Sequence, residues 1–281
     1  MVSKFSRRPA LLLTVALAAA VSLGACAGKV KPKTDLAYQE RPVELLYATG
    51  AERLDQRQWS EALQYFDEVE RQHPYSEWAR RAILMEAYAN YQANRYDDAI
   101  AAADRFISLY PGQPSTPYAY YLKAICWFEQ IVDVGRDQAA TEQAQAALNE
   151  VVKRFPTSPY AVDAKLKLDM VRDQLAGKEM AVGRYYLRAG QPIAAINRFR
   201  SVIDRYQTTS HTPEALYRLV EANLSLGLKD EAVKDGAVLG YNYPGDRWYA
   251  DAYGLLTAKG LKPAVEPKAR AHSVLDRIGK S

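Results

Sequence analysis

An alanine, a bulky apolar residue and a proline recur at fixed offsets along most of this 281-residue chain. In residues 59–74, Ala62, Phe66 and Val69 lie at i, i+4 and i+7, and Pro74 follows at i+12. The first three share one face of an α-helix, and the proline ends that helix because it cannot continue the hydrogen-bond ladder. The same grid, with single departures, begins again at four later alanines: Ala99, Ala144, Ala195 and Ala232.

Each copy of the grid is preceded by another apolar-periodic segment, and these lie at residues 45–54, 83–91, 118–128, 180–187 and 216–224. Tandem helix pairs with a small residue where two helices cross are typical of tetratricopeptide repeats. The key alanines are 37, 45, 51 and 37 residues apart, whereas a standard repeat has about 34 residues. We therefore predict an all-α fold, a right-handed solenoid of about five tetratricopeptide-like helix pairs, closed by a C-terminal capping helix.

Two stretches account for the longer spacings. Residues 132–141 are expected to form an enlarged turn within the third pair. Residues 159–180 carry an apolar side chain every three or four positions, and this helix can continue through Gly177 into the first helix of the fourth pair. In the turns between pairs, a proline stops one helix, and a serine or threonine is expected to cap the next.

The amino-terminal residues resemble a bacterial lipoprotein signal. A basic region with Lys4, Arg7 and Arg8 precedes a short apolar core, and Gly24 and Ala25 stand just before Cys26. Such a signal implies cleavage before Cys26 and lipidation of its sulfur and amine, which gives firm anchoring because several acyl chains are attached. The alternative is an ordinary secretory signal cut nearby, with Cys26 incidental.

These features divide the chain into a signal peptide at 1–25, a lipidated tether at 26–41, the solenoid at 42–256 and a basic tail at 257–281. The resemblance to a lipoprotein signal also implies that Ala27, which follows the cysteine, favours transport to the outer membrane of a Gram-negative cell, on its periplasmic face. The net charge is +4, and loss of the three leader cations leaves about +1. We therefore expect no nucleic-acid partner. Cys126, in an apolar run, is predicted to be a buried free thiol.

No catalytic motif is found in the sequence. It contains no phosphate loop, GxSxG, HExxH, CxxC or calcium-loop pattern. The three histidines, His73, His211 and His272, are far apart in sequence. We predict that the protein is not an enzyme and binds neither a cofactor nor a metal.

Tyrosine is abundant, with twenty residues in the chain. Five of them cluster on the predicted first helices of the second and third pairs: Tyr88, Tyr91, Tyr118, Tyr120 and Tyr121. First helices of such solenoids line the concave face, where tyrosine offers a large contact area with a polar tip. The cluster is a candidate groove for an extended or aromatic-ended peptide, and the alternative for each tyrosine is packing between repeats.

The lipoprotein signal, the tether and five irregular helix pairs together resemble the BamD (ComL) family of the outer-membrane β-barrel assembly machinery. The most specific stretches are HPYSEWARRAILMEAYANY from His73, ADRFISLYPGQPSTPYAYYLKA from Ala103 and RDQLAGKEMAVGRYYLRAG from Arg172. The resemblance implies a non-catalytic scaffold that binds the core protein BamA through its later repeats, beside other lipoproteins of the machinery. It also implies capture of unfolded barrel precursors, through an aromatic C-terminal signal, near the earlier repeats.

A second hypothesis keeps the same architecture and changes the partner. Another periplasmic tetratricopeptide lipoprotein could serve cell-envelope division, pilus assembly or peptidoglycan machinery. A hidden enzyme is a third class, and it would require a polar cluster with perturbed acidities in a closed pocket.

Overall fold

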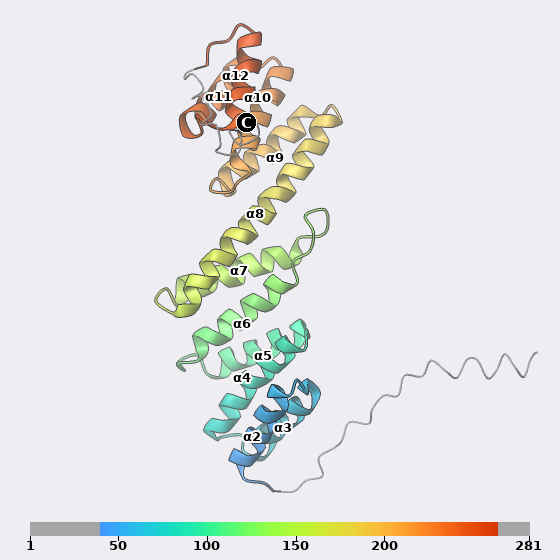
Figure 1. The fold of residues 1–281 in the computed structure, drawn as a ribbon, viewed down its shortest axis with the longest axis vertical. Helices are drawn as coiled ribbons and strands as arrows, with labels where there is room; N and C mark the ends of the chain where they lie inside the picture. The colour runs from blue at the N-terminus through green and yellow to red at the C-terminus, as the bar shows by residue number, and fades with distance from the viewer. Residues whose placement is uncertain (1–39, 264–281) are drawn as a thin grey trace, which may run out of the picture. The chain divides into compact units, whose positions relative to one another are not determined.

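The computed structural model describes residues 40–263. They form eleven α-helices, with no β-strand among them (Figure 1). In chain order these are α2 (Val43–Asp55), α3 (Trp59–Gln72), α4 (Glu77–Gln92), α5 (Tyr96–Leu109), α6 (Thr116–Glu129), α7 (Ala139–Arg154), α8 (Pro159–Arg188), α9 (Pro192–Arg205), α10 (Thr212–Ser225), α11 (Lys229–Asn242) and α12 (Arg247–Ala258). The predicted all-α class is confirmed.

The alanine grid marks the second helix of each pair, and its side chains form the core between helices. Its five alanines are fully buried: Ala62, Ala99, Ala144, Ala195 and Ala232. The large residues beside them are buried as well: Phe66, Phe106, Leu148, Phe199 and Leu239. Each second helix packs against the first helix before it and the first helix after it, which makes the tetratricopeptide-like solenoid.

Two first helices carry a glycine where a large side chain of the second helix crosses them. A Cβ added to Gly50 would lie 2.8 Å from the Phe66 ring, and one added to Gly183 would lie 2.5 Å from the Phe199 ring. Both distances are too short for a real contact. The rings therefore reach the backbone of the partner helix only because these positions lack a side chain.

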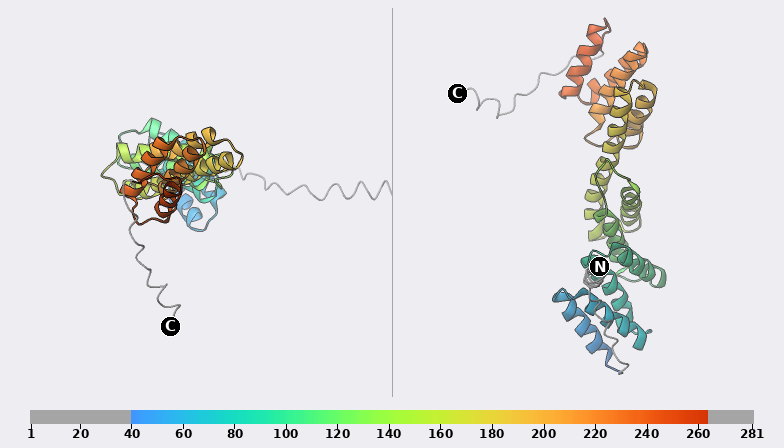
Figure 2. Two further views of the ribbon diagram at one scale, coloured as in Figure 1. Left: turned by 90° about the horizontal axis from the view of Figure 1, so that it is seen from above. Right: turned by 90° about the vertical axis from the view of Figure 1, so that its right-hand side faces the viewer.

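The first helices α2, α4, α6 and α8 also contact one another from pair to pair. In the described part of the chain the second helices α3, α5 and α7 make no comparable contacts among themselves. The first helices consequently lie on the inner side of the stack, where successive helices approach more closely. The pairs follow one another in chain order (Figure 2).

The enlarged spacings arise from the two predicted features, although α7 begins at Ala139, within the turn predicted at 132–141. Residues 130–138 between α6 and α7 are not helical, and α8 runs without a break for 30 residues through Gly177. The first half of α8 packs on α6 and α7, and α9 follows its second half. Helix α12 packs against α10 and α11 and covers the last pair. None of the helices in residues 40–263 has the length and apolar character needed to cross a membrane.

The capping prediction holds at two turns and is wrong at a third. The Ser76 and Ser158 hydroxyls accept hydrogen bonds from the backbone N–H groups of Ala79 and Ala161. Ser115, however, has helical backbone angles and caps nothing with its side chain. There the hydroxyl of Thr116 donates instead to the carbonyl of Tyr110. The turn before α6 is longer, and its backbone is already helical at Ser115.

Candidate polypeptide-binding site

Aromatic side chains contact each other between successive first helices at three junctions, and we call these pairs aromatic rungs. Their ring centroids lie 5.0 to 5.2 Å apart, which is the usual range for interacting aromatic rings. The rungs are Tyr47–Trp78, Tyr121–Tyr160 and Tyr217–Trp248. In each, the second member stands two residues after the residue that caps its helix: Ser76, Ser158 or Asp246.

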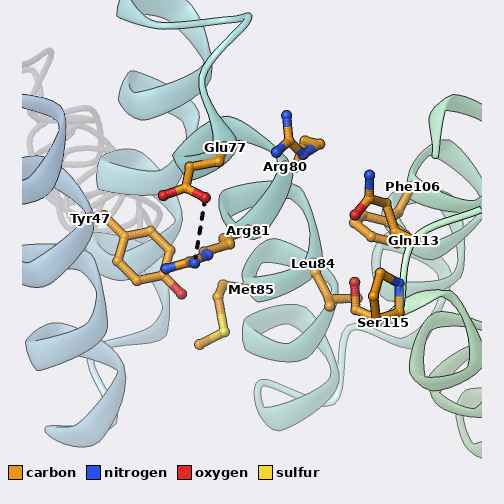
Figure 3. A pocket seen from close by; sticks show the side chains of 10 residues that line it. Tyr47, Glu77, Arg80, Arg81, Leu84, Met85, Phe106, Gln113 and Ser115 are labelled. Atoms are coloured by element: carbon orange, nitrogen blue, oxygen red, sulfur yellow. Dashed lines mark ion pairs between the residues drawn. The ribbon is translucent and has the colours of Figure 1, made fainter.

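The junction between α4 and α6 has no aromatic rung. One repeat of 37 residues after Tyr47 and Trp78, the chain carries Leu84 and Ser115. Both residues line a cavity of about 380 Å³. Figure 3 shows Leu84 beside Ser115 in this cavity. The space that a rung fills elsewhere is open here, and we call it the rung pocket.

The rung pocket combines an apolar wall with cationic side chains. Leu84, Met85 and Phe106 supply apolar surface, while Arg80 and Arg81 supply guanidinium groups. Arg81 lies 3.7 Å from a Glu77 carboxylate oxygen and stacks over Trp78 at 4.9 Å. Arg80 lies 6.0 Å from the Tyr110 ring centroid. An aromatic side chain and a carboxylate from one ligand could be bound together here, since guanidinium groups pair well with carboxylates.

Four of the five predicted tyrosines lie together on α4 and α6, although none of them lines this pocket. On α4, Leu84, Tyr88 and Tyr91 lie on one face, because their spacing follows the helical repeat. Tyr88, Tyr91 and Tyr118 pack against one buried cluster that includes Leu122. Burial, and then the neighbouring tyrosine hydroxyls, raise the pKa of Tyr118 well above its ordinary value. These half-buried rings form a continuous aromatic surface from α4 to α6.

Tyr121 continues the surface to α8. Its ring stacks on Tyr160, and its hydroxyl donates a 2.5 Å hydrogen bond to Asp163. Lys167 binds the same carboxylate at 2.7 Å. Burial opposes ionisation of Asp163, but the hydrogen bonds from Lys167 and Tyr121 outweigh it and lower the pKa of that carboxyl group. The aromatic surface therefore ends at a charged, hydrogen-bonded border.

Tyr120 lies apart from the other four. Its ring is 5.2 Å from Phe155 in the turn before α8, and Arg154 stacks over it at 5.3 Å. It fills the junction between repeats, as the packing alternative describes. Tyr160 joins the cluster instead and was missed by the sequence reasoning. The signal for it was present, since an aromatic residue stands two positions after the capping residue in three helices.

A second cavity, of about 320 Å³, lies between α8 and α10. Its lining residues are Arg184, Leu187, Arg188, Arg218 and Glu221. Arg184 and Arg218 pair with Glu214 at 2.9 and 3.4 Å, and Arg218 pairs also with Glu221. This cavity in the later repeats is cationic with one aliphatic wall, and we call it the arginine cavity.

Within residues 40–263 there is no cluster of His, Cys, Asp or Glu suited to a metal ion. Cys126 is a buried free thiol, as predicted, and burial raises its pKa to about 12. Cys26 lies outside the described residues.

Comparisons with known proteins connect this chain with outer membrane lipoproteins and assembly factors. A family described as outer membrane lipoprotein (YfiO) matches residues 39–239. The outer membrane protein assembly factor BamD of Caulobacter vibrioides is 67% identical over 276 residues, covering 98% of this chain and 90% of that one. BamD of Rickettsia prowazekii is 45% identical over 244 residues, covering 87% and 97%. A solved tetratricopeptide protein of Thermus thermophilus aligns with 75% of this chain and 98% of that one, at 18% identity and a TM-score of 0.36.

Proposed function

This chain belongs to the outer membrane lipoprotein family that includes the BamD assembly factors, and on that basis we propose that it is a non-catalytic scaffold for barrel assembly. It binds unfolded barrel precursors with its earlier repeats and the core protein BamA with its later ones. Holding both on one body raises their effective concentration, so that no nucleotide is required. The alternative roles in division, pilus or peptidoglycan machinery lose support, because the relatives are named as outer membrane assembly factors.

The rung pocket is the observation that carries this proposal. A precursor ending in an aromatic residue places its ring where a rung is missing, against Leu84 and Met85. Its terminal carboxylate then meets Arg80 or Arg81. The preceding residues extend over Tyr88, Tyr118 and the other tyrosines of the cluster. Because the wall is already built by neighbouring helices, the scaffold itself loses little conformational entropy on binding.

The later repeats supply a separate site. The arginine cavity between α8 and α10 accepts an acidic side chain flanked by an aliphatic one, and Arg188 at its rim is exposed. We assign the BamA contact to this region. Its distance along the chain from the rung pocket lets both partners bind at once.

The chain is associated with the outer membrane, as its family is. Acyl chains on Cys26 anchor it to the periplasmic face, after removal of residues 1–25, and residues 26–41 act as the tether. The basic tail predicted at 257–281 stays part of the proposal, although α12 runs to Ala258 and residues 264–281 lie outside the described residues. Mass spectrometry of the mature amino terminus tests the anchor, because an unmodified Cys26 would remove it from the proposal.

A peptide titration tests precursor capture. A short synthetic peptide ending in phenylalanine is compared with the same peptide carrying a terminal amide, using fluorescence anisotropy. A charge-assisted hydrogen bond is worth about 1.5–3 kcal/mol, so the free carboxylate should bind about tenfold more tightly or better. Arg80→Gln should reduce that preference.

The control is Tyr75→Ala, since Tyr75 is 98% exposed and lies outside the pocket. It should bind both peptides as the unmodified protein does. Equal affinity of the acid and the amide for the unmodified protein would contradict carboxylate recognition by the two arginines.

A further inference from the structure

The first half of α8 is a first helix without a second helix of its own. Ser76 and Ser158 cap α4 and α8 in the same way, so the two helices can be compared position by position. The place of Leu84 in α4 is taken by Leu166 in α8, and the place of Tyr88 by Met170. Arg80 corresponds in the same way to Val162.

In α4 this face is partly covered by the next first helix, and the rung pocket leaves the rest open. Leu84 packs against a buried cluster that includes Ala119, and Tyr88 against one that includes Leu122, both of which belong to α6. In α8 the corresponding face is bare. Val162, Leu166 and Met170 are 65%, 64% and 61% exposed, although all three are apolar. They stand at i, i+4 and i+8, and so form one stripe along the helix.

The length of α8 explains the bare stripe. Because α8 continues for 30 residues, the next first helix meets it farther along. The start of α10 lies against its second half, where His211 is close to Gly177 and Glu214 binds Arg184. One helix position of the solenoid is therefore vacant beside residues 162–170.

Charged residues beside the stripe are ordered along the helix. Lys165 is exposed, and its ammonium group has no hydrogen bond or ion pair to any residue within 40–263. Asp169 is exposed one turn later, with Arg172 at 3.3 Å. Asp173 follows and accepts hydrogen bonds from Ser210. On this side of the stripe the charge changes from positive at Lys165 to negative at Asp169 and Asp173, while on the other side Asp163 and Lys167 bind each other.

We propose that the stripe of Val162, Leu166 and Met170 binds an amphipathic α-helix of a partner protein, which fills the vacant position parallel to α8. The partner helix carries an acidic residue near its start, opposite Lys165, and a basic residue near its end, opposite Asp169. That order also suits the dipole of the partner helix. In this type of recognition an amphipathic helix binds an apolar surface through side chains spaced three and four residues apart.

Photo-crosslinking tests this surface in the full-length lipoprotein in intact cells. The photoreactive p-benzoylphenylalanine replaces Leu166, and crosslinked residues are mapped by mass spectrometry. The expected product joins position 166 to one segment of another envelope protein, with apolar residues at helical spacing and the stated charge order. The same amino acid at Tyr241, which is 81% exposed on α11, is the control for general exposure and should not give that product.

Charge variants give a second readout. Lys165→Glu should lower the yield of the product by about two- to fivefold, as expected for an exposed ion pair, while Lys165→Arg should retain it. Circular dichroism checks that the helices remain folded. Crosslinks confined to residues 264–281 of the same chain, to a second copy, or to no polypeptide at all would overturn the proposal.

Discussion

Arg105 on α5 holds the buried carboxyl group of Glu86 on α4, with Nη2 2.5 Å from Oε2. The same guanidinium also binds both carboxylate oxygens of Glu70 on α3, at 2.7 and 3.1 Å. Burial, and then the neighbouring Glu70, raise the pKa of Glu86 to about 9, although Arg105 opposes this. The second carboxylate oxygen of Glu86, Oε1, is buried without a partner. Glu86 therefore carries a proton at neutral pH.

This proton makes stability depend on pH. The folded state keeps it above the usual pKa of 4.5, where the unfolded chain has released it. The stabilisation is therefore complete below pH 4.5 and is lost as the pH rises toward about 9. The free energy of unfolding should fall across this range by at most about 1.4 kcal/mol per pH unit. Glu86→Gln, which keeps a neutral side chain, should flatten the fall, as measured by urea unfolding; equal slopes would contradict a protonated Glu86 in the folded state.

The Phe199 ring lies so close to Gly183 that a single added methyl group should lower the stability of the fold strongly. Gly183→Ala would push a Cβ against the Phe199 ring, and overpacking of this kind costs about 1–3 kcal/mol. Gly254→Ala is the matched control, because Gly254 also lies in a helix but has nothing within 4 Å of an added Cβ. It should stabilise the protein by about 0.5–1 kcal/mol, through helix propensity. Thermal unfolding of both variants gives the comparison, and two changes of the same sign would refute it.

Replacing Arg57 with glycine should stabilise the fold. Arg57 is exposed in the turn between α2 and α3, with φ of +59°, a conformation that side chains other than glycine adopt at a cost. The corresponding turn after α8 has Gly190, at φ of +71°. Arg57→Gly should therefore raise the free energy of unfolding by about 1 kcal/mol. Arg57→Ala retains the strain and should bring no such gain. A loss of stability in the glycine variant would show that the arginine makes a compensating contact.

If the tyrosine surface binds peptides, substitutions of the five tyrosines should differ in their effect on peptide affinity. Tyr88→Ala combined with Tyr121→Ala should weaken binding of precursor C-terminal peptides by about tenfold or more, because aromatic contacts of this size are worth about 0.5–1.5 kcal/mol each. Tyr120→Ala should leave peptide affinity unchanged, since Tyr120 packs against Phe155 instead. Isothermal titration calorimetry measures both, with helicity checked by circular dichroism. An equal loss in the two proteins would remove the distinction.

The apolar periodicity of the sequence was sufficient to predict most of the helices. The grid at Ala62 and its four repeats predicted the second helices, because a small residue at a helix crossing has a geometric reason. The unbroken α8 followed from the apolar spacing of residues 159–180 and its continuation through Gly177. The prediction that Ser115 caps α6 was wrong, because the turn before α6 is longer than the turns before α4 and α8. The sequence pattern does not determine the backbone angles in such a turn.

The candidate site was only partly predictable. Clustering in sequence grouped Tyr120 with its neighbours, yet adjacent positions on a helix face different directions. The rung pocket required knowing which residues meet across helices, as Tyr47 and Trp78 do over 31 positions. The network of Glu70, Glu86 and Arg105 joins three helices, and no local pattern marks it.

The central claim is that a missing aromatic rung leaves a place for the aromatic end of a client polypeptide. Ser115→Tyr restores an aromatic residue at that junction and should fill the place. The decisive measurement is the affinity of two peptides, one ending in phenylalanine and one in alanine, for the unmodified protein and for this variant. The account predicts a preference for phenylalanine of about tenfold in the unmodified protein, and its loss in Ser115→Tyr. The same preference in both proteins would contradict it.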